Sequence, residues 1–119
     1  MGFFGSKKSA DAKAREFAAK KGVDVGDAVA VGRAFEDGVE RLLVVHPGRV
    51  EWHHLGRALT GGGAGVTSIP GDRIGSVSTR REGIWGVVSV QGSGVDVEFR
   101  TDLAEMERLA GAIKSVTLA

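Results

Sequence analysis

Short strand-like segments, separated by turns that contain glycine, occupy most of this sequence between residues 28 and 100. Apolar and polar residues alternate most regularly over 95–100, where Val95, Val97 and Phe99 are expected to face a core. Such alternation is typical of strands with one buried face. The 19 glycines of the 119-residue chain recur at short intervals, as expected where tight turns join many strands. The pattern predicts antiparallel strands within one domain.

Seven strands are expected, at residues 28–35, 40–46, 49–55, 66–69, 73–79, 84–90 and 95–100. The first is ambiguous because the sequence from Asp27 to Gly38 also fits a short helix, but its β-branched content favours a strand. Pro47-Gly48 joins the second and third strands in a hairpin. Proline disfavours the primed turns of two-residue hairpins, so we expect this loop to be a residue or two longer.

Two helices are expected to flank the strands. The first runs from Ser9 to Lys21, with Ser9 as its N-cap. The second begins at Asp102, whose spacing to Glu105 is that of a capping box. The apolar residues of this second helix lie on one side: Leu103, Met106, Leu109, Ala110, Ile113 and Val116. The chain is therefore predicted to be an α+β protein whose last helix packs on the sheet.

This order of elements resembles the bacterial pleckstrin-homology-like (PH-like) domain family, of the kind found in actinobacterial and phage proteins. The matching motifs are Leu42-Leu-Val-Val-His-Pro-Gly-Arg-Val50, Ile69-Pro-Gly-Asp-Arg-Ile-Gly-Ser-Val77, Gly83-Ile-Trp-Gly86 and Val97-Glu-Phe-Arg-Thr-Asp102. The resemblance covers residues 25–118. It implies a PH-like barrel of about seven antiparallel strands with a C-terminal capping helix and an extra N-terminal helix. Because these motifs hold turn and core positions, they imply a fold far more than an activity.

Charge divides the chain into a basic N-terminal arm and helix, residues 1–22, and a PH-like domain, residues 23–119. The arm has six basic and two acidic residues, a net charge of +4, whereas the remainder carries −3. A basic arm on an acidic body favours contact with an anionic surface through the arm. The residues expected to make such contact are Phe3, Phe4, Lys7, Lys8, Lys13, Lys20 and Lys21. Alternatively, the alanine face of the helix packs on the domain while the lysine stems extend into water.

The sequence predicts no catalytic, cofactor or metal site. It has no cysteine, no nucleophile motif and no phosphate-binding glycine motif. Adjacent His53 and His54 point to opposite faces of their strand. His46 and His53 lie four residues apart along the hairpin, or about 13 Å, which is too far to share a metal ion. We therefore expect a protein that is not an enzyme.

The sequence predicts instead a non-enzymatic interaction module that binds a protein partner or forms a homo-oligomer. Arg57, Arg80, Arg81 and Trp85 are candidates for binding a peptide or an acidic partner. Alternatively, Arg80 and Arg81 belong to a solvated turn next to a core tryptophan. The sheet edges and the loop 56–65 are further candidate contact surfaces. The alternatives are a peripheral membrane adaptor that uses the basic aromatic arm and, more weakly, a nucleic-acid-binding regulator. Without an apolar run that could span a membrane, we expect a cytoplasmic protein.

Overall fold

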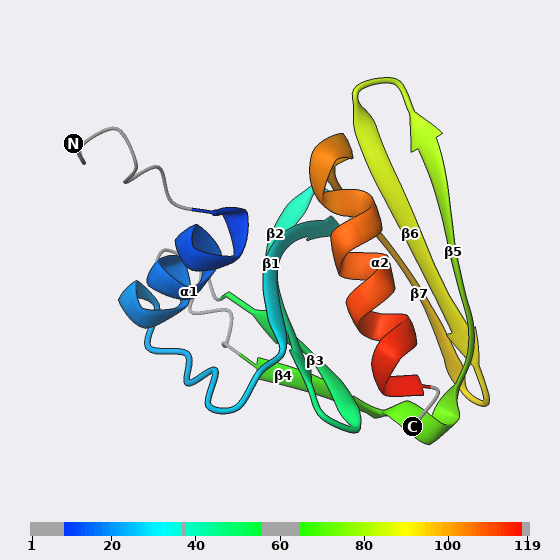
Figure 1. Ribbon diagram of the computed structural model, residues 1–119, viewed down its shortest axis with the longest axis horizontal. Helices are drawn as coiled ribbons and strands as arrows, with labels where there is room; N and C mark the ends of the chain where they lie inside the picture. Colours follow the sequence, from blue (N-terminus) through cyan, green and yellow to red (C-terminus); the bar gives the residue numbers. More distant parts are fainter. Residues whose placement is uncertain (1–8, 37, 56–64, 118–119) are drawn as a thin grey trace.

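The computed structural model describes residues 9–36, 38–55 and 65–117. It is an α+β structure in which one helix precedes a seven-stranded antiparallel sheet and one follows it (Figure 1). The elements are α1 (Ala10–Lys20), β1 (Ala30–Glu36), β2 (Val39–His46), β3 (Arg49–His54), β4 (Gly65–Pro70), the 3-10 helix η2 (Gly71–Arg73), β5 (Ile74–Glu82), β6 (Trp85–Gly92), β7 (Val95–Asp102) and α2 (Leu103–Thr117). The predicted α+β class with seven strands and two helices is confirmed.

The sheet is open, which differs from the barrel implied by the resemblance. Its strand order is β4-β3-β2-β1-β7-β6-β5, so β4 and β5 form the two edges although they follow one another in the chain. η2 joins these edge strands, and the described residues show no pairing between them. The sheet curves around α2, which lies between the β1–β4 half and the β5–β7 half (Figure 1).

The main core lies between α2 and the inner, concave face of the sheet. Leu109, Ala110, Ile113 and Val116 of α2 are buried in it, as their helical spacing predicts. A Cβ atom at Gly32 of β1 would lie only 2.6 Å from Leu109 Cδ2, so the absence of a side chain at Gly32 lets Leu109 of α2 pack this closely on β1. The strands that surround α2 contribute the opposing apolar side chains.

The ambiguous segment before residue 38 is a strand, as predicted. β1 pairs with β2 in continuous register from Ala30 opposite Val45 to Glu36 opposite Val39. Both faces of β1 carry buried residues, because Val31 packs on the outer face under α1 and Ala34 packs in the inner core. Burial on both faces explains why simple alternation was a weak signal here.

The loop between β2 and β3 is shorter than expected. His46 and Arg49 are opposite each other in the ladder, so Pro47 and Gly48 alone form the turn. Gly48 has φ +84°, in the left-handed region that a type II turn requires at its second central residue. The carbonyl oxygen of Gly48 also accepts a hydrogen bond from the Gly71 N–H at 2.8 Å, which anchors the turn to η2.

The two helix starts behave differently. The Ser9 side chain accepts a hydrogen bond from the Ala12 N–H at 3.1 Å, which confirms the predicted N-cap. The predicted capping box of α2 is not formed, because the Glu105 carboxylate is hydrogen-bonded to the Arg108 guanidinium instead. Asp102 remains the last residue of β7.

Candidate interaction surfaces

Strand β4 is an edge of the sheet that carries no charged residue. Five of its six residues are exposed, and Ile69 alone is buried. Val66 is 54% exposed. One side of β4 pairs with β3, while no described strand pairs with the other. Edge strands of monomeric proteins are usually protected by charges, prolines or bulges, and β4 has only Pro70 at its end.

Strand β5, at the opposite edge, has the usual protective features. Its register with β6 shifts between Ile74 and Ser76, which marks a β-bulge near its start. Its other end carries Arg80, Arg81 and Glu82. Because bulges and charges both hinder the addition of a further strand, β4 is the less protected of the two edges.

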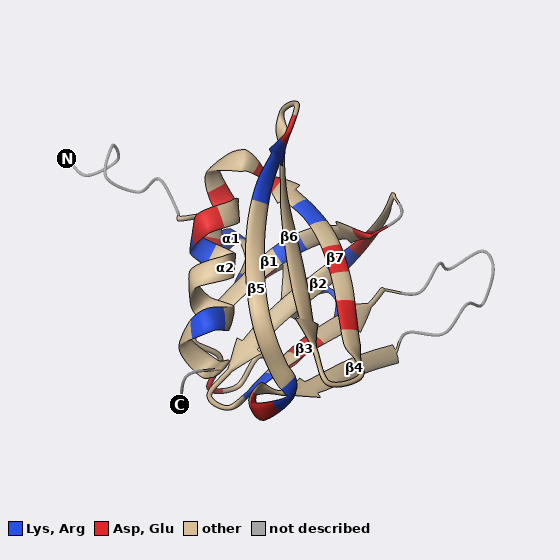
Figure 2. Cartoon of the chain, turned by 90° about the vertical axis from the view of Figure 1, so that its right-hand side faces the viewer, with Lys and Arg blue, Asp and Glu red and all other residues tan. Residues whose placement is uncertain are grey.

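The positive charge of Arg80 is compensated within the outer face of the sheet. Its Nη1 lies 2.9 Å from Glu98 Oε2, and its Nη2 lies 3.3 Å from Glu82 Oε2. Arg100 also donates to Glu82, and both basic and acidic residues lie on β5 and β7 (Figure 2). Hydrogen bonds from Arg100 and Arg80, respectively, hold the pKa values of Glu82 and Glu98 below their ordinary values.

Three of the four residues predicted to bind a partner are described, and they do not gather in one place. Arg80 and Trp85 lie on the outer face, because Trp85 is opposite Glu82 in the ladder and Arg80 precedes Glu82 by two positions. Arg81 lies on the inner face, where its Nε donates to the Gly83 carbonyl oxygen at 3.2 Å. Arg57 lies outside the described residues. Arg80 and Trp85 therefore share a face of the sheet, while Arg81 lies on the opposite one.

The N-terminal helix turns its small apolar residues toward the sheet. Ala14 and Ala18 are buried against β1 and β2. Lys13, Lys20 and Lys21 remain exposed, and Lys21 Nζ lies 5.5 Å from the centroid of the Phe17 ring. The apolar face of α1 is thus already occupied, and its lysines alone remain for contact with an anionic surface. The predicted contacts Phe3, Phe4, Lys7 and Lys8 lie outside the described residues.

A polar network that the sequence analysis did not find ties α1 to β1 and α2. Asp11 Oδ1 accepts hydrogen bonds from the Val31 N–H at 2.9 Å and from Arg108 Nη1 at 3.1 Å. Arg15 Nε donates to Asp11 Oδ2 at 2.6 Å, and Arg108 Nη2 donates to the Val31 carbonyl oxygen at 2.9 Å. Burial raises the pKa of Asp11, but these hydrogen bonds and positive charges outweigh it and lower the pKa. Because 97 residues separate Asp11 from Arg108, no local sequence pattern indicates this contact.

A second network corrects the expected separation of two histidines. His46 is only 3% exposed, with Nδ1 3.0 Å from Asp27 Oδ1 and Nε2 3.0 Å from Glu51 Oε1. His53 Nε2 also lies 3.0 Å from Glu51 Oε1. The prediction of about 13 Å describes their backbone positions but is wrong for the rings, which converge on one carboxylate oxygen.

Glu51 is the centre of this histidine network and remains ionised over a wide pH range. Burial raises the pKa of Glu51, but hydrogen bonds from His53, Arg49 and His46 outweigh this effect and lower it to about 2. Arg49 Nε contributes at 3.1 Å from Glu51 Oε2. Among the described residues, no group of three or more histidine and acidic side chains is arranged to hold a metal ion.

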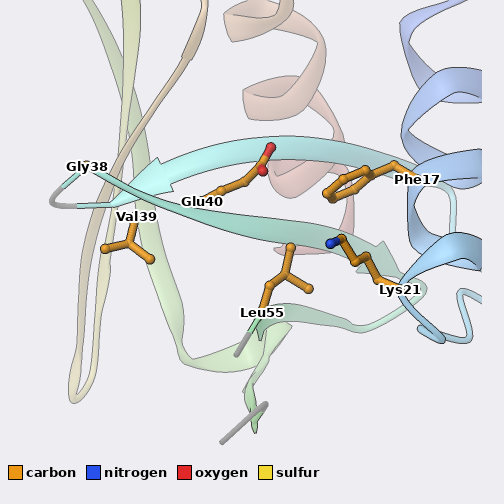
Figure 3. A pocket seen from close by; sticks show the side chains of 6 residues that line it. All are labelled: Phe17, Lys21, Gly38, Val39, Glu40 and Leu55. Atoms are coloured by element: carbon orange, nitrogen blue, oxygen red, sulfur yellow. The ribbon is translucent and has the colours of Figure 1, made fainter. Parts of the chain in front are cut away.

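A hollow of about 230 Å³ lies between α1 and the start of β2 (Figure 3). Its lining residues are Phe17, Lys21, Gly38, Val39, Glu40 and Leu55. One basic and one acidic side chain contribute to the lining, and the acidic one already bonds Arg33. The charge of this hollow therefore selects neither an anionic nor a cationic ligand.

The comparisons with protein-family models and with curated proteins add no relative from which a function could be transferred. No protein-family model matches the sequence, and the search of curated proteins found no match. Within the described part of the chain, no helix has the length and apolar character needed to cross a membrane.

Proposed function

We propose that this chain is a non-enzymatic protein-interaction module of the PH-like type, which self-associates or binds a protein partner along strand β4. The PH-like assignment is supported by the antiparallel strand order β4-β3-β2-β1-β7-β6-β5 and by a C-terminal helix packed in the hollow of the curved sheet. Because such a scaffold hosts many functions, the function is argued from the surface.

The contrast between the two sheet edges carries this proposal. β4 exposes an uncharged row of residues and backbone groups that no described strand pairs, while β5 is protected by a bulge and by charges. An unprotected edge strand is a template for an added strand, which gains main-chain hydrogen bonds over its whole length. We therefore place the contact at β4.

Two copies of the chain can meet at β4 through a two-fold axis perpendicular to the sheet. The strands then run antiparallel, and a central residue such as Thr67 faces its own copy. With Thr67 at the axis, Val66 of one copy faces Ser68 of the other on the outer face of the continuous sheet. Each contact is made twice, so a substitution in β4 also acts twice.

The experiment is a measurement of molar mass by light scattering over a concentration series of the full chain. We expect a dimer that the substitution Val66→Lys converts to a monomer, because two lysines would then flank the axis. Ser78→Lys, an exposed position on the other edge strand, is the matched control and should leave the mass unchanged. A full chain that stays monomeric at high concentration would contradict self-association through β4.

The alternatives that use the basic arm receive less support from the described residues. A membrane adaptor needs a helix with a free apolar face, but the alanine face of α1 is buried against the sheet. The lysines of α1 are exposed, so α1 would bind a membrane or a nucleic acid through electrostatic attraction. Such binding would weaken steeply with salt, whereas strand addition at the uncharged β4 edge would not.

A further inference from the structure

A second surface feature lies on the outer face, where strands β1, β6 and β7 meet. It is a shallow hollow of about 210 Å³, lined by Arg33, Phe35, Trp85 and Asp102. In the described residues, β1 and β7 share only the register pair Phe35 and Arg100, so the two strands diverge beside the hollow. The Thr101 hydroxyl donates to the Arg33 carbonyl oxygen at 3.1 Å and bridges this seam.

Two aromatic rings form the apolar part of the hollow. The centroids of Phe35 and Trp85 are 5.9 Å apart, with an angle of 59° between the ring planes. Both side chains are half-buried, so the sheet holds them while part of each ring stays accessible. Aromatic ring faces carry partial negative charge and attract cations.

The charges around these rings leave one group uncompensated. Asp102 is exposed, lies opposite Trp85 in the ladder, and has no side-chain hydrogen bond or ion pair within the described residues. Arg33, at the other side of the hollow, is hydrogen-bonded to Glu40 and lies 4.4 Å from the centroid of the Phe17 ring. The free charge beside the two rings is therefore negative.

We propose that this hollow binds an arginine side chain presented by a partner protein. Phe35 and Trp85 would contact the guanidinium through their ring faces, while Asp102 would accept its hydrogen bonds. Arginine is favoured over lysine because a planar, weakly hydrated guanidinium both stacks on aromatic rings and pairs with a carboxylate. The negative charge of Asp102 thus favours a basic partner, in contrast to the acidic partner expected from Arg80 and Arg81.

This site is independent of the proposed contact at β4. In the strand order, β3 and β2 separate β4 from β1, which is the nearest strand of the hollow. Loss of self-association would not affect the hollow, and failure of arginine to bind would not affect β4. A negative result for one of the two contacts therefore does not count against the other.

The test is a titration of the isotope-labelled full chain with the peptide acetyl-Gly-Arg-Gly-amide, followed by NMR. The signals to follow are the indole N–H groups of the two tryptophans. Trp85 lines the hollow and should show a saturable shift. Trp52 is 2% exposed in the inner core and serves as an internal reference that should not move. Binding should be weak and sensitive to salt, as expected for one side chain in a shallow site.

Two peptides and two variants decide the outcome. The matching citrulline peptide has the shape of arginine without its charge and should produce no saturable shift. Asp102→Asn should weaken arginine binding about tenfold, as expected for loss of a charged hydrogen bond, while asparagine remains compatible with a helix start. Asp96→Asn, at an exposed position on the same face of β7, should have no effect. Equal binding of both peptides, full binding by Asp102→Asn, or no shift of Trp85 would each overturn the proposal.

Discussion

The two helices pack on opposite faces of one sheet by different means. On the inner face, α2 inserts large side chains, of which Leu109 and Ile113 are fully buried. On the outer face, α1 places Ala14 and Ala18 against the strands and adds the network centred on Asp11. Burial of a methylene group contributes about 0.8 kcal/mol, so leucine and isoleucine stabilise a contact much more than alanine does.

This difference shows that the stability of a contact and its geometry can come from different interactions. The Asp11 and Arg108 side chains are 29% and 30% exposed, and such an ion pair contributes little net stability. The hydrogen bond from the Val31 N–H to Asp11 is directional, however, and defines where α1 lies along β1, while Arg108 of α2 bonds the Val31 carbonyl oxygen and Asp11. We infer that apolar burial holds α2 in place, while the polar network positions α1.

The largest effect is expected from Leu109→Ala on the inner face. Removal of this fully buried side chain leaves a cavity between α2 and Gly32 and should lower the free energy of unfolding by about 3 kcal/mol. Urea denaturation measures the change. Lys114→Ala, an exposed change on the same helix, should stay within about 0.5 kcal/mol of the unchanged chain. Similar losses of the free energy of unfolding in the two variants would contradict the inference that apolar burial holds α2 in place.

The next effect concerns Glu51 in the histidine network. Its pKa in the folded chain is about 2, below the ordinary value of 4.5, so the folded state favours the ionised form. The resulting stability is fully present above pH 4.5 and is lost as the pH falls from 4.5 toward 2. Glu51→Gln should therefore lower the free energy of unfolding by on the order of 2 kcal/mol near neutral pH. It should also reduce the loss of stability as the pH falls below 4.5.

Urea denaturation at a series of pH values tests the prediction for Glu51. Glu107→Gln on the exposed side of α2 is the matched control, and its stability profile should follow that of the unchanged chain. If Glu51→Gln retained the full acid dependence, another carboxylate would have to be responsible for it.

A smaller effect is expected from Asp11→Asn on the outer face. It removes a charged partner of Arg15 and Arg108 and should cost about 1 kcal/mol. Hydrogen exchange gives the sharper measurement, because the amides of α1 and of Val31 should exchange faster while those in the middle of α2 stay protected. Combination with Arg108→Gln should cost less than the two single changes together. Strict additivity would show that these two residues are not coupled.

The smallest effect is expected from Arg80→Gln in the exposed ion-pair network. Arg80, Glu82 and Glu98 face water, where ion pairs are screened and contribute little. We expect no resolvable change in the urea midpoint at either low or high salt. A loss as large as that of Asp11→Asn would remove the distinction between the exposed network and the one that positions α1.

Sequence reasoning succeeded where the signal is local. The alternation of Val95, Val97 and Phe99 and the apolar spacing of α2 predicted which side chains enter the core, because one buried face imposes a period of two on a strand and 3.6 on a helix. Side-chain directions were harder to predict, since His46 and His53 lie far apart along the backbone yet reach the same carboxylate oxygen. The candidate site was least predictable, because the expected strand ends at residue 79, whereas β5 continues to Glu82 and so directs Arg80 and Arg81 to opposite faces of the sheet.

By itself, the sequence determined the seven strands, the two helices and most of the inner core, since each follows from neighbouring residues and their burial pattern. The tertiary structure alone decided that the sheet stays open at β4 and β5 and that Asp11 meets Arg108. Among the described residues, it also left Asp102 without an ion pair or hydrogen bond of its side chain, beside Trp85 and Phe35. These outcomes depend on where strands and helices distant in the chain come to lie, and long-range packing is not encoded in local periodicity.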